Sequence, residues 1–235
     1  MIINMWSGPR NISTALMRSF ENRTDTNVID EPFYAYYLKK TKLKHPMYTK
    51  IIKNYETNKN KIIRNLSNDS NNIKFIKHMT HHIDINDDLK WLKNTKNFFL
   101  IREPIKVINS YIKKNKLVSI YDLGYIEQLK IFDYLNSTSN RKPIVVNATY
   151  LLKNPKKILT KLCHNLDLKF ENFMLEWPKG KRSSDGIWSK VWYKKVEQST
   201  TFNKFRKEYI VVPKKYSKIY DESLKYYDAM NKYSL

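Results

Sequence analysis

The sequence of 235 residues is poor in glycine, in cysteine and in acidic side chains. It contains 4 Gly, whereas average usage would give roughly 16, so each glycine is expected where only glycine fits. The single Cys163 excludes an internal disulfide, and its place in an apolar helical pattern indicates a buried thiol. The chain also lacks an apolar run of about 20 residues, which argues against a membrane-spanning helix.

The first residues contain no basic stretch followed by an apolar core, and they lead directly into a Ser-Gly-Pro loop. This pattern differs from that of a signal peptide, so we expect the protein to be cytoplasmic. Because neither a repeat nor a linker interrupts the chain, we expect residues 1–235 to form a single domain. The sequence leaves the oligomeric state open.

Basic residues outnumber acidic ones, with 44 Lys and Arg against 22 Asp and Glu and a net charge of +22. Such a charge suggests an anionic partner, either a nucleic acid, a membrane surface or a small polyanion. However, the lysines are scattered, and Lys, Asn, Ile and Tyr all have A/T-rich codons, so genome composition explains much of the excess. We therefore expect a solvated basic surface that attracts a small anion, with neither a nucleic acid nor a membrane as partner.

Short apolar stretches alternate with helical patterns along the chain. We expect strands at residues 2–6, 28–30, 75–79, 97–101 and 143–147. We expect helices at residues 13–20, 34–44, within 46–72, and at 87–93, 104–113, 122–136, 155–166 and 217–231. This alternation predicts an α/β fold of three layers, a mainly parallel sheet with helices on both faces. Ligands bind such sheets at the carboxyl ends of the strands.

The loop after the first strand has the features of a phosphate-binding loop. Its residues are Gly8, Pro9, Arg10, Asn11, Ile12, Ser13 and Thr14. Backbone N–H groups and the positive end of the following helix meet there, and Arg10 adds a charge-assisted donor. The loop differs from the nucleoside-triphosphate loop G-x-x-x-x-G-K-[ST] in lacking the second Gly and the Lys. A capped helix after a turn is the structural alternative.

A second phosphate site is predicted after the fourth expected strand. Arg102 follows that strand directly, and Ser110 lies about two turns into the next helix. An Arg and a Ser that converge from a strand end suit a phosphate group. Pairing of Arg102 with a carboxylate is the alternative.

These motifs, in this order, resemble the family of sulfotransferases that use 3′-phosphoadenosine 5′-phosphosulfate, in a divergent bacterial subgroup. Residues 9–14 are similar to the loop that grips the 5′-phosphosulfate, and Arg102 and Ser110 match the pair that holds the 3′-phosphate. Residues 142–168 resemble the family's strand followed by an Asn-Pro helix start. The resemblance implies a fold like that of P-loop NTPases, with Arg10 in place of the family Lys and Ile12 where Gly is usual. Ile12 leaves open whether the enzyme is active.

A further match concerns residues 177–188, which are similar to the family's Arg-Lys-Gly…Gly-Asp-Trp loop that closes over the nucleotide. By this resemblance the segment would supply the nucleotide-binding residues Lys179, Gly180, Lys181, Arg182 and Trp188. The Gly-Asp order is reversed at Asp185 and Gly186. Three of the four glycines, Gly8, Gly180 and Gly186, would then belong to the nucleotide site.

The resemblance implies that a sulfuryl group moves from this donor to a hydroxyl or amine of a small-molecule acceptor, releasing adenosine 3′,5′-bisphosphate. Such a transfer needs cations on the leaving phosphate, here Arg10 and Lys77, and a base for the acceptor proton. Glu31, after the second strand, and His81, after the third, both remain candidates for the base. No metal is expected, because His81 and His82 are adjacent and no carboxylate has suitable spacing.

Two other functions stay open at this point. A P-loop kinase-like phosphotransferase would need the missing Lys-Ser/Thr and an acidic strand motif for Mg²⁺. A non-catalytic protein that binds a nucleotide or a nucleic acid is favoured only by the charge.

Overall fold

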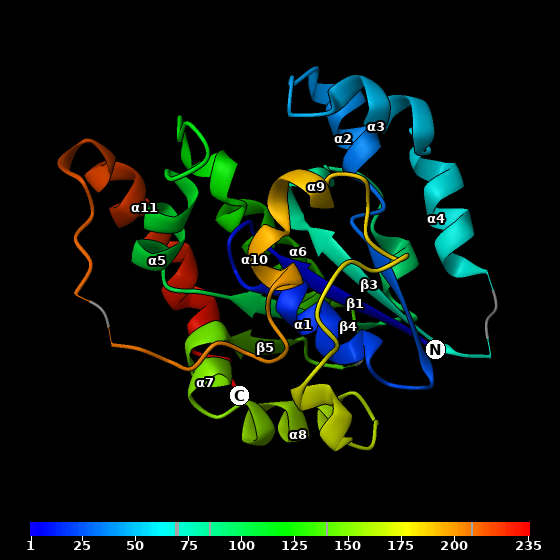
Figure 1. Ribbon diagram of the computed structural model, residues 1–235. Helices are drawn as coiled ribbons and strands as arrows, with labels where there is room; N and C mark the ends of the chain where they lie inside the picture. Colours follow the sequence, from blue (N-terminus) through cyan, green and yellow to red (C-terminus); the bar gives the residue numbers. More distant parts are fainter. Residues whose placement is uncertain (69–70, 85, 140, 208) are drawn as a thin grey trace.

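A single parallel sheet organises the chain (Figure 1). The computed structural model describes residues 1–68, 71–84, 86–139, 141–207 and 209–235, and in these ranges five strands pair in the order β2-β3-β1-β4-β5. The strands are β1 (Ile2–Ser7), β2 (Thr26–Asp30), β3 (Ile73–Met79), β4 (Lys96–Ile101) and β5 (Ile144–Asn147). The predicted α/β fold with a parallel sheet is confirmed.

The register of the strands brings their carboxyl ends to one edge of the sheet. Ser7 at the end of β1 is level with Met79 of β3 and Leu100 of β4, and Asp30 of β2 is level with Lys77. The loops that follow these strands therefore meet at this edge, where ligands bind in open α/β sheets.

Helices cover both faces of the sheet, because neighbouring strand residues are apolar on both sides. Phe75 and Phe98 pack in one core cluster, whereas Ile76 and Phe99 pack in the other. The helices are α1 (Ser13–Glu21), α2 (Tyr34–Thr41), α3 (Tyr48–Asn54), α4 (Lys59–Ser67), α5 (Pro104–Tyr111), α6 (Tyr125–Thr138), α7 (Ala148–Lys153), α8 (Pro155–Asn165), α9 (Ser189–Trp192), α10 (Lys194–Glu197) and α11 (Ser217–Asn231). The first cluster packs against α1, α7 and α8, and the second against α5, α6 and α11 (Figure 1).

Two predicted helices differ in the structure. The polar stretch at 46–72 forms two helices, because Tyr55 is extended and the Asn58 side chain caps a new helix by accepting from the N–H of Lys61. Residues 69 and 70 of this stretch lie outside the described residues. Residues 87–93 contain only a 3₁₀ turn at Lys90–Leu92, and α7 and α9–α10 were not predicted. No helix in the described part of the chain is long and apolar enough to cross a membrane.

Candidate active site

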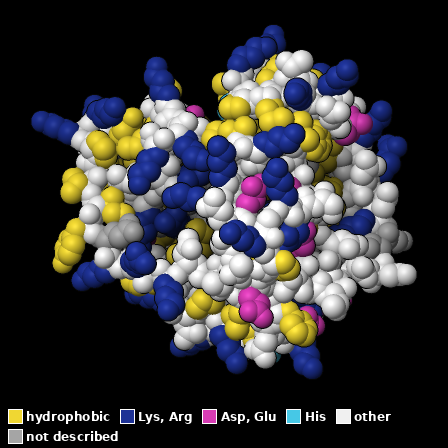
Figure 2. Space-filling model, in the orientation of Figure 1, with side chains coloured by type: hydrophobic (Ala, Val, Ile, Leu, Met, Phe, Trp, Pro, Cys, Tyr) yellow, Lys and Arg dark blue, Asp and Glu magenta, His cyan; other side chains and the backbone are white. Residues whose placement is uncertain are grey.

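A cavity of about 750 Å³ opens at the carboxyl edge of the sheet. The loops after β1, β2, β3 and β4 line it, together with residues 192–206 from the far end of the chain. Figure 2 shows Lys and Arg side chains gathered around a hollow on this face, over α5 and α10. A cavity of this size is typical of small-ligand sites, so the contacts of its lining residues decide what it can hold.

The loop between β1 and α1 leaves the first turn of α1 without a capping side chain. Ile12, at the cap position, has φ 60° and ψ 18°, and its side chain makes no capping hydrogen bond. Arg10 also has a positive φ, of 64°. The backbone thus keeps at Ile12 the left-handed turn that glycine favours, at a cost of about 1–3 kcal/mol, as is common at binding sites. The N–H groups at the start of α1 remain available to an anion.

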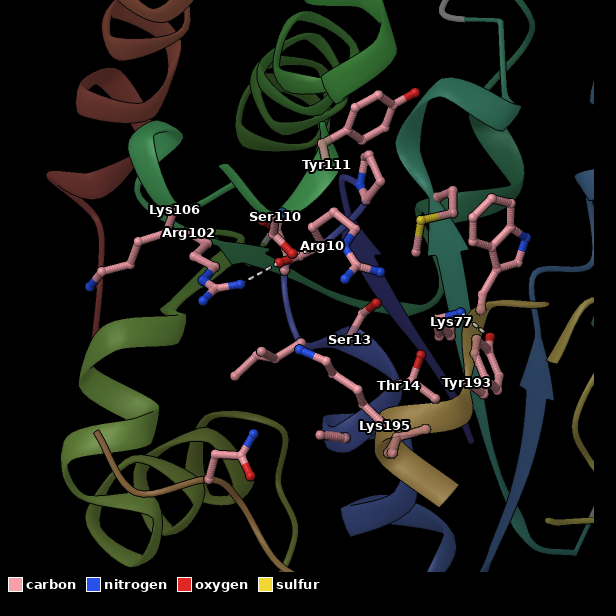
Figure 3. A pocket seen from close by; sticks show the side chains of 18 of the residues that line it. Arg10, Ser13, Thr14, Lys77, Arg102, Lys106, Ser110, Tyr111, Tyr193 and Lys195 are labelled. Atoms are coloured by element: carbon pink, nitrogen blue, oxygen red, sulfur yellow. Dashed lines mark hydrogen bonds between the residues drawn. The ribbon is translucent and has the colours of Figure 1, made fainter. Parts of the chain in front are cut away.

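Three polar side chains predicted to bind phosphate meet beside this loop (Figure 3). The Arg10 Nε donates to Ser110 Oγ at 2.9 Å, and the Arg102 guanidinium donates to the Arg10 carbonyl at 2.7 Å. The Tyr125 hydroxyl in turn donates to the Arg102 carbonyl at 2.7 Å. The structure therefore joins the two predicted phosphate sites into one cradle.

Further cations surround this cradle. The pKa of Lys114 is lowered, first by burial and then by the charges of Arg10, Lys194 and Lys195. Of these, Arg10 and Lys195 line the cavity, and Lys106 lines it too. Cations that repel one another around a cavity favour an anionic ligand, which relieves the repulsion.

The structure gives Gly8 a different role from the predicted phosphate contact. Gly8 is not among the residues that line the cavity. A Cβ at Gly8 would overlap the carbonyl oxygen of Leu123, so glycine is required there for close packing of two loops. Gly124, which the sequence left unassigned, lies on the other side of this contact and has a φ of 70°. The two glycines thus allow the loop after β1 to pack closely against the turn at Leu123 and Gly124, outside the cavity lining.

The segment expected to close over the nucleotide lies elsewhere. Its predicted binding residues Lys179, Gly180, Lys181, Arg182 and Trp188 are absent from the cavity lining. Asp185 instead makes a bidentate ion pair with the buried Arg18 of α1, at 2.5 and 2.7 Å, and accepts from the Arg182 N–H. These contacts hold the segment against the side of α1.

The residues that cover the cavity come immediately after that segment. They are Trp192, Tyr193, Lys195, Val196, Ser199, Thr201, Phe202, Asn203, Lys204, Phe205 and Arg206. Sequence reasoning missed most of this cover, although the run Lys204-Phe205-Arg206, basic and aromatic together, is a signal that could have indicated it. Of the remaining predicted residues, Pro9 to Thr14, Glu31, Lys77, His81, Arg102 and Ser110 all line the cavity.

Lys77 lies at the floor of the cavity and is 1% exposed. Its ammonium donates to Asp30 at 2.8 Å, to the Tyr193 hydroxyl at 2.7 Å and to the Glu31 carboxylate. Burial opposes the charge, but Asp30 and Glu31 outweigh it and hold the pKa of Lys77 well above its usual value. All three N–H donors of the ammonium are thereby used.

Asp30 is the centre of this buried network. Besides Lys77, it accepts from the Tyr193 hydroxyl at 2.8 Å, from Trp188 Nε1 at 3.0 Å and from the Gly186 N–H at 3.2 Å. Because Gly186 and Trp188 precede the cavity cover and Tyr193 belongs to it, one carboxylate anchors the start of that cover to the sheet.

Removal of the Tyr193 hydroxyl tests this anchor. Tyr193→Phe is expected to lower the free energy of unfolding by about 1–2 kcal/mol, because buried Lys77 loses an acceptor and buried Asp30 a donor. Urea unfolding measures the change, and Tyr209→Phe, at a side chain 96% exposed, is the matched control. Equal losses in the two variants would contradict the proposed anchoring.

Glu31 is held beside Lys77 in an unusual backbone conformation. Its φ is 46°, its N–H donates to the Lys77 carbonyl at 2.9 Å, and its carboxylate contacts the Lys77 ammonium. Burial raises the pKa of Glu31, while the Lys77 charge opposes the rise. A carboxylate whose pKa is raised toward the working pH suits proton transfer.

The three histidines near β3 are uncharged at neutral pH. Burial lowers the pKa of His81 to about 4 and that of His82 well below its usual value, and both rings line the cavity. His78 points away, stacks on Trp6 with centroids 4.2 Å apart and bonds to Asn4. Within the described ranges, no group of three or more His, Cys, Asp or Glu could hold a metal ion.

Comparisons of sequence identify relatives over almost the whole chain. A family model described as "Sulfotransferase domain" matches residues 1–234. The branched-chain-amino-acid aminotransferase-like proteins 1 and 2 of Arabidopsis thaliana are 32% and 29% identical over 98% and 97% of this chain. The chain spans 40% and 41% of the length of these two proteins.

Comparisons of structure give a consistent result. A sulfotransferase domain from the Synechococcus PCC 7002 olefin synthase aligns with a TM-score of 0.64 at 17% identity, over 100% of this chain and 95% of that one. A sulfotransferase domain from the curacin biosynthetic pathway gives 0.55 at 16%, over 94% and 96%. A sulfotransferase from Alicyclobacillus acidocaldarius gives 0.60 at 9%, over 99% and 96%. At these identities the likeness shows a shared fold.

Proposed function

Because this chain belongs to the sulfotransferase domain family, and so is a transferase of sulfuryl groups, we propose that its donor is 3′-phosphoadenosine 5′-phosphosulfate. The proposed acceptor is a hydroxyl or amine of a small molecule. One observation carries this proposal: Arg10 is hydrogen-bonded to both Ser110 and Arg102. All three residues line one cavity, and Glu31 lines it too. Two anion sites beside a carboxylate are what a bisphosphate donor and a proton-bearing acceptor require.

The donor fits the charges that line the cavity. The N–H groups of the first turn of α1, with Arg10, Ser13 and Thr14, would hold the 5′-phosphosulfate. Arg102 and Ser110 would hold the 3′-phosphate. Figure 3 shows Arg102 and Lys106 on one side of Arg10, and Lys77 and Tyr193 on the other. This arrangement supports a donor that extends from the 3′-phosphate site, past Arg10, toward Glu31.

In the proposed reaction the acceptor oxygen attacks the sulfur in line with the leaving phosphate oxygen. The new O–S bond forms as the S–O bond to the phosphate breaks, and the acceptor proton passes to Glu31. The products are the sulfate ester and adenosine 3′,5′-bisphosphate. Arg10 and the start of α1 stabilise the negative charge that grows on the leaving phosphate.

Lys77 acts through Glu31 in this proposal, in place of the expected contact with the bridging oxygen. Its three donors already bond to Asp30, Glu31 and Tyr193. The ammonium therefore orients the Glu31 carboxylate and opposes the rise of its pKa. His81 is the alternative base, but a pKa of about 4 disfavours the imidazolium that it would form.

Arg102 provides the test of the donor. Arg102→Ala is expected to weaken binding of adenosine 3′,5′-bisphosphate by about 10- to 100-fold, because a charge-assisted contact with the 3′-phosphate is lost. Binding of adenosine 5′-monophosphate, which lacks that phosphate, should change by less than about 3-fold. Calorimetric titration measures both.

Two controls accompany this titration. Arg141→Ala removes an exposed Arg outside the cavity lining and should leave both affinities unchanged. The melting temperature shows whether loss of the Arg102 bond to Arg10 disturbs folding. Unchanged affinity of Arg102→Ala for the bisphosphate would remove the 3′-phosphate assignment.

A further inference from the structure

Carboxylates occupy the end of the cavity away from Arg102, in a chain with few acidic residues. We call this region the acceptor end, which consists of the lining residues Glu31, Tyr34, His45, His81, His82, Tyr111 and Asp122. Lys77, below Glu31, shares its charge with Asp30 and is 1% exposed. Of the described residues at the acceptor end, the fixed charges that remain are the carboxylates of Glu31 and Asp122.

Asp122 faces this region without a cationic partner. Its Oδ2 accepts from the backbone N–H groups of Val118 and Ser119 at 2.8 and 3.0 Å, and no described Lys or Arg forms an ion pair with it. The charge of Asp122 acts on the neighbouring tyrosine side chains. The pKa values of Tyr37 and Tyr111 are raised to about 12, first by burial and next by Asp122.

The histidines of the acceptor end supply no positive charge. Burial lowers the pKa of His45, that of His81 to about 4, and that of His82 well below its usual value. His82 is 4% exposed, and its Nδ1, like that of His81, has no hydrogen-bond partner within the described residues. Both nitrogen atoms are themselves buried, and the His81 Nδ1 lies beside Gly124, so the two imidazoles leave this end of the cavity uncharged.

These observations fit a ligand with a positive charge. Two carboxylates and aromatic rings attract an ammonium group, and uncharged imidazoles do not repel it. None of the described lining residues of the acceptor end is a Lys or Arg, so an anionic ligand would be repelled there by Glu31 and Asp122. We propose that the acceptor is an amino alcohol or aminophenol whose ammonium group lies between Asp122 and the ring of Tyr111. This inference rests on the proposed function, because it takes the hydroxyl beside Glu31 as the reacting group.

A series of three phenols tests the charge of the acceptor. Tyramine, 4-ethylphenol and 4-hydroxyphenylacetate have similar lengths but carry a positive, neutral and negative group opposite the hydroxyl. Each is titrated calorimetrically into protein saturated with adenosine 3′,5′-bisphosphate. Tyramine is expected to bind about 10-fold more tightly than 4-ethylphenol, and 4-hydroxyphenylacetate more weakly than both.

Variants of Asp122 test the site itself. Asp122→Asn keeps an amide oxygen for the Val118 and Ser119 N–H groups, so the loop is retained while the charge is removed. It should weaken the binding of tyramine by about 10-fold and change the affinity for 4-ethylphenol by less than about 2-fold. Asp88→Asn, at a side chain 65% exposed, is the matched control and should change neither.

The outcomes separate this inference from the proposed function. Equal affinity for the three phenols, preference for the anion, binding of none of them, or an Asp122→Asn effect on all three alike would overturn the cationic acceptor. Failure of adenosine 3′,5′-bisphosphate to bind would instead contradict the proposed donor.

Discussion

Glu31→Gln is expected to lower kcat by about 10³-fold while the affinity for adenosine 3′,5′-bisphosphate stays within about 2-fold. The amide keeps the shape of the side chain and an oxygen that can accept from Lys77, but it cannot take the acceptor proton. Transfer of labelled sulfate from the donor to an accepted alcohol measures kcat. A loss confined to kcat would assign Glu31 to the chemical step.

His81→Gln is the matched comparison, because it removes the other candidate base from the same cavity. We expect it to lower kcat by less than about 10-fold, since a His81 pKa of about 4 disfavours a protonated intermediate state. A loss of about 10³-fold for His81→Gln, with little change for Glu31→Gln, would assign the base to His81.

The pH profile of kcat gives a second test of Glu31 as the base. In the proposed reaction the ionised Glu31 carboxylate is the active form, and its pKa is raised from 4.5, mainly by burial. Activity should therefore fall as the pH falls, with an acid limb above pH 4.5. This limb should be absent from the residual activity of Glu31→Gln. An identical limb in the variant would point to another titrating group.

Lys77→Met is expected to destabilise the protein by about 3–5 kcal/mol at pH 7, the range measured when one partner of a buried ion pair is removed. The variant leaves Asp30 and Glu31 side by side without the ammonium that bonds to both. Urea unfolding at pH 7 measures the change. Lys90→Met, at a side chain 79% exposed, is the control and should have almost no effect.

The loss of stability caused by Lys77→Met should be larger at pH 7 than at pH 4. Burial and the neighbouring Asp30 raise the pKa of Glu31, and without Lys77 the main influence that opposes this rise in the folded state is lost. Such a group destabilises the fold as the pH rises through the carboxyl range, and the penalty is absent below about pH 4. Lys77→Met and the unmodified protein should therefore differ less at pH 4 than at pH 7. A deficit independent of pH would mean that lost packing dominates.

Much of the architecture could be predicted because it depends on local pattern. Strands that are apolar on both faces, such as the one containing Phe98 and Phe99, require cover on both sides, and the structure has it. The link from Arg10 to Ser110 follows from the same rule, since loops after parallel strands share one edge.

The structure differs from the sequence-based predictions where contacts between distant parts of the chain decide the arrangement. The basic run from Lys179 to Arg182 has the composition of a nucleotide-binding loop, but the Arg18–Asp185 ion pair turns it toward α1. No local pattern shows that Arg18 is buried opposite Asp185. In the same way, the resemblance placed Lys77 on the leaving phosphate, and no local pattern showed its bond to Tyr193, which lies over a hundred residues away.

The four donors that converge on Asp30 have a consequence for the order of events in turnover. Gly186 and Trp188, just before the cavity cover, and Tyr193 within it bond to Asp30, and Lys77 bonds to the same carboxylate. Under the proposed function, a displacement of the cover that broke these bonds would also remove hydrogen-bond partners from the group that orients Glu31. Release of the proposed nucleotide product and alignment of the proposed base would then be coupled through one buried carboxylate.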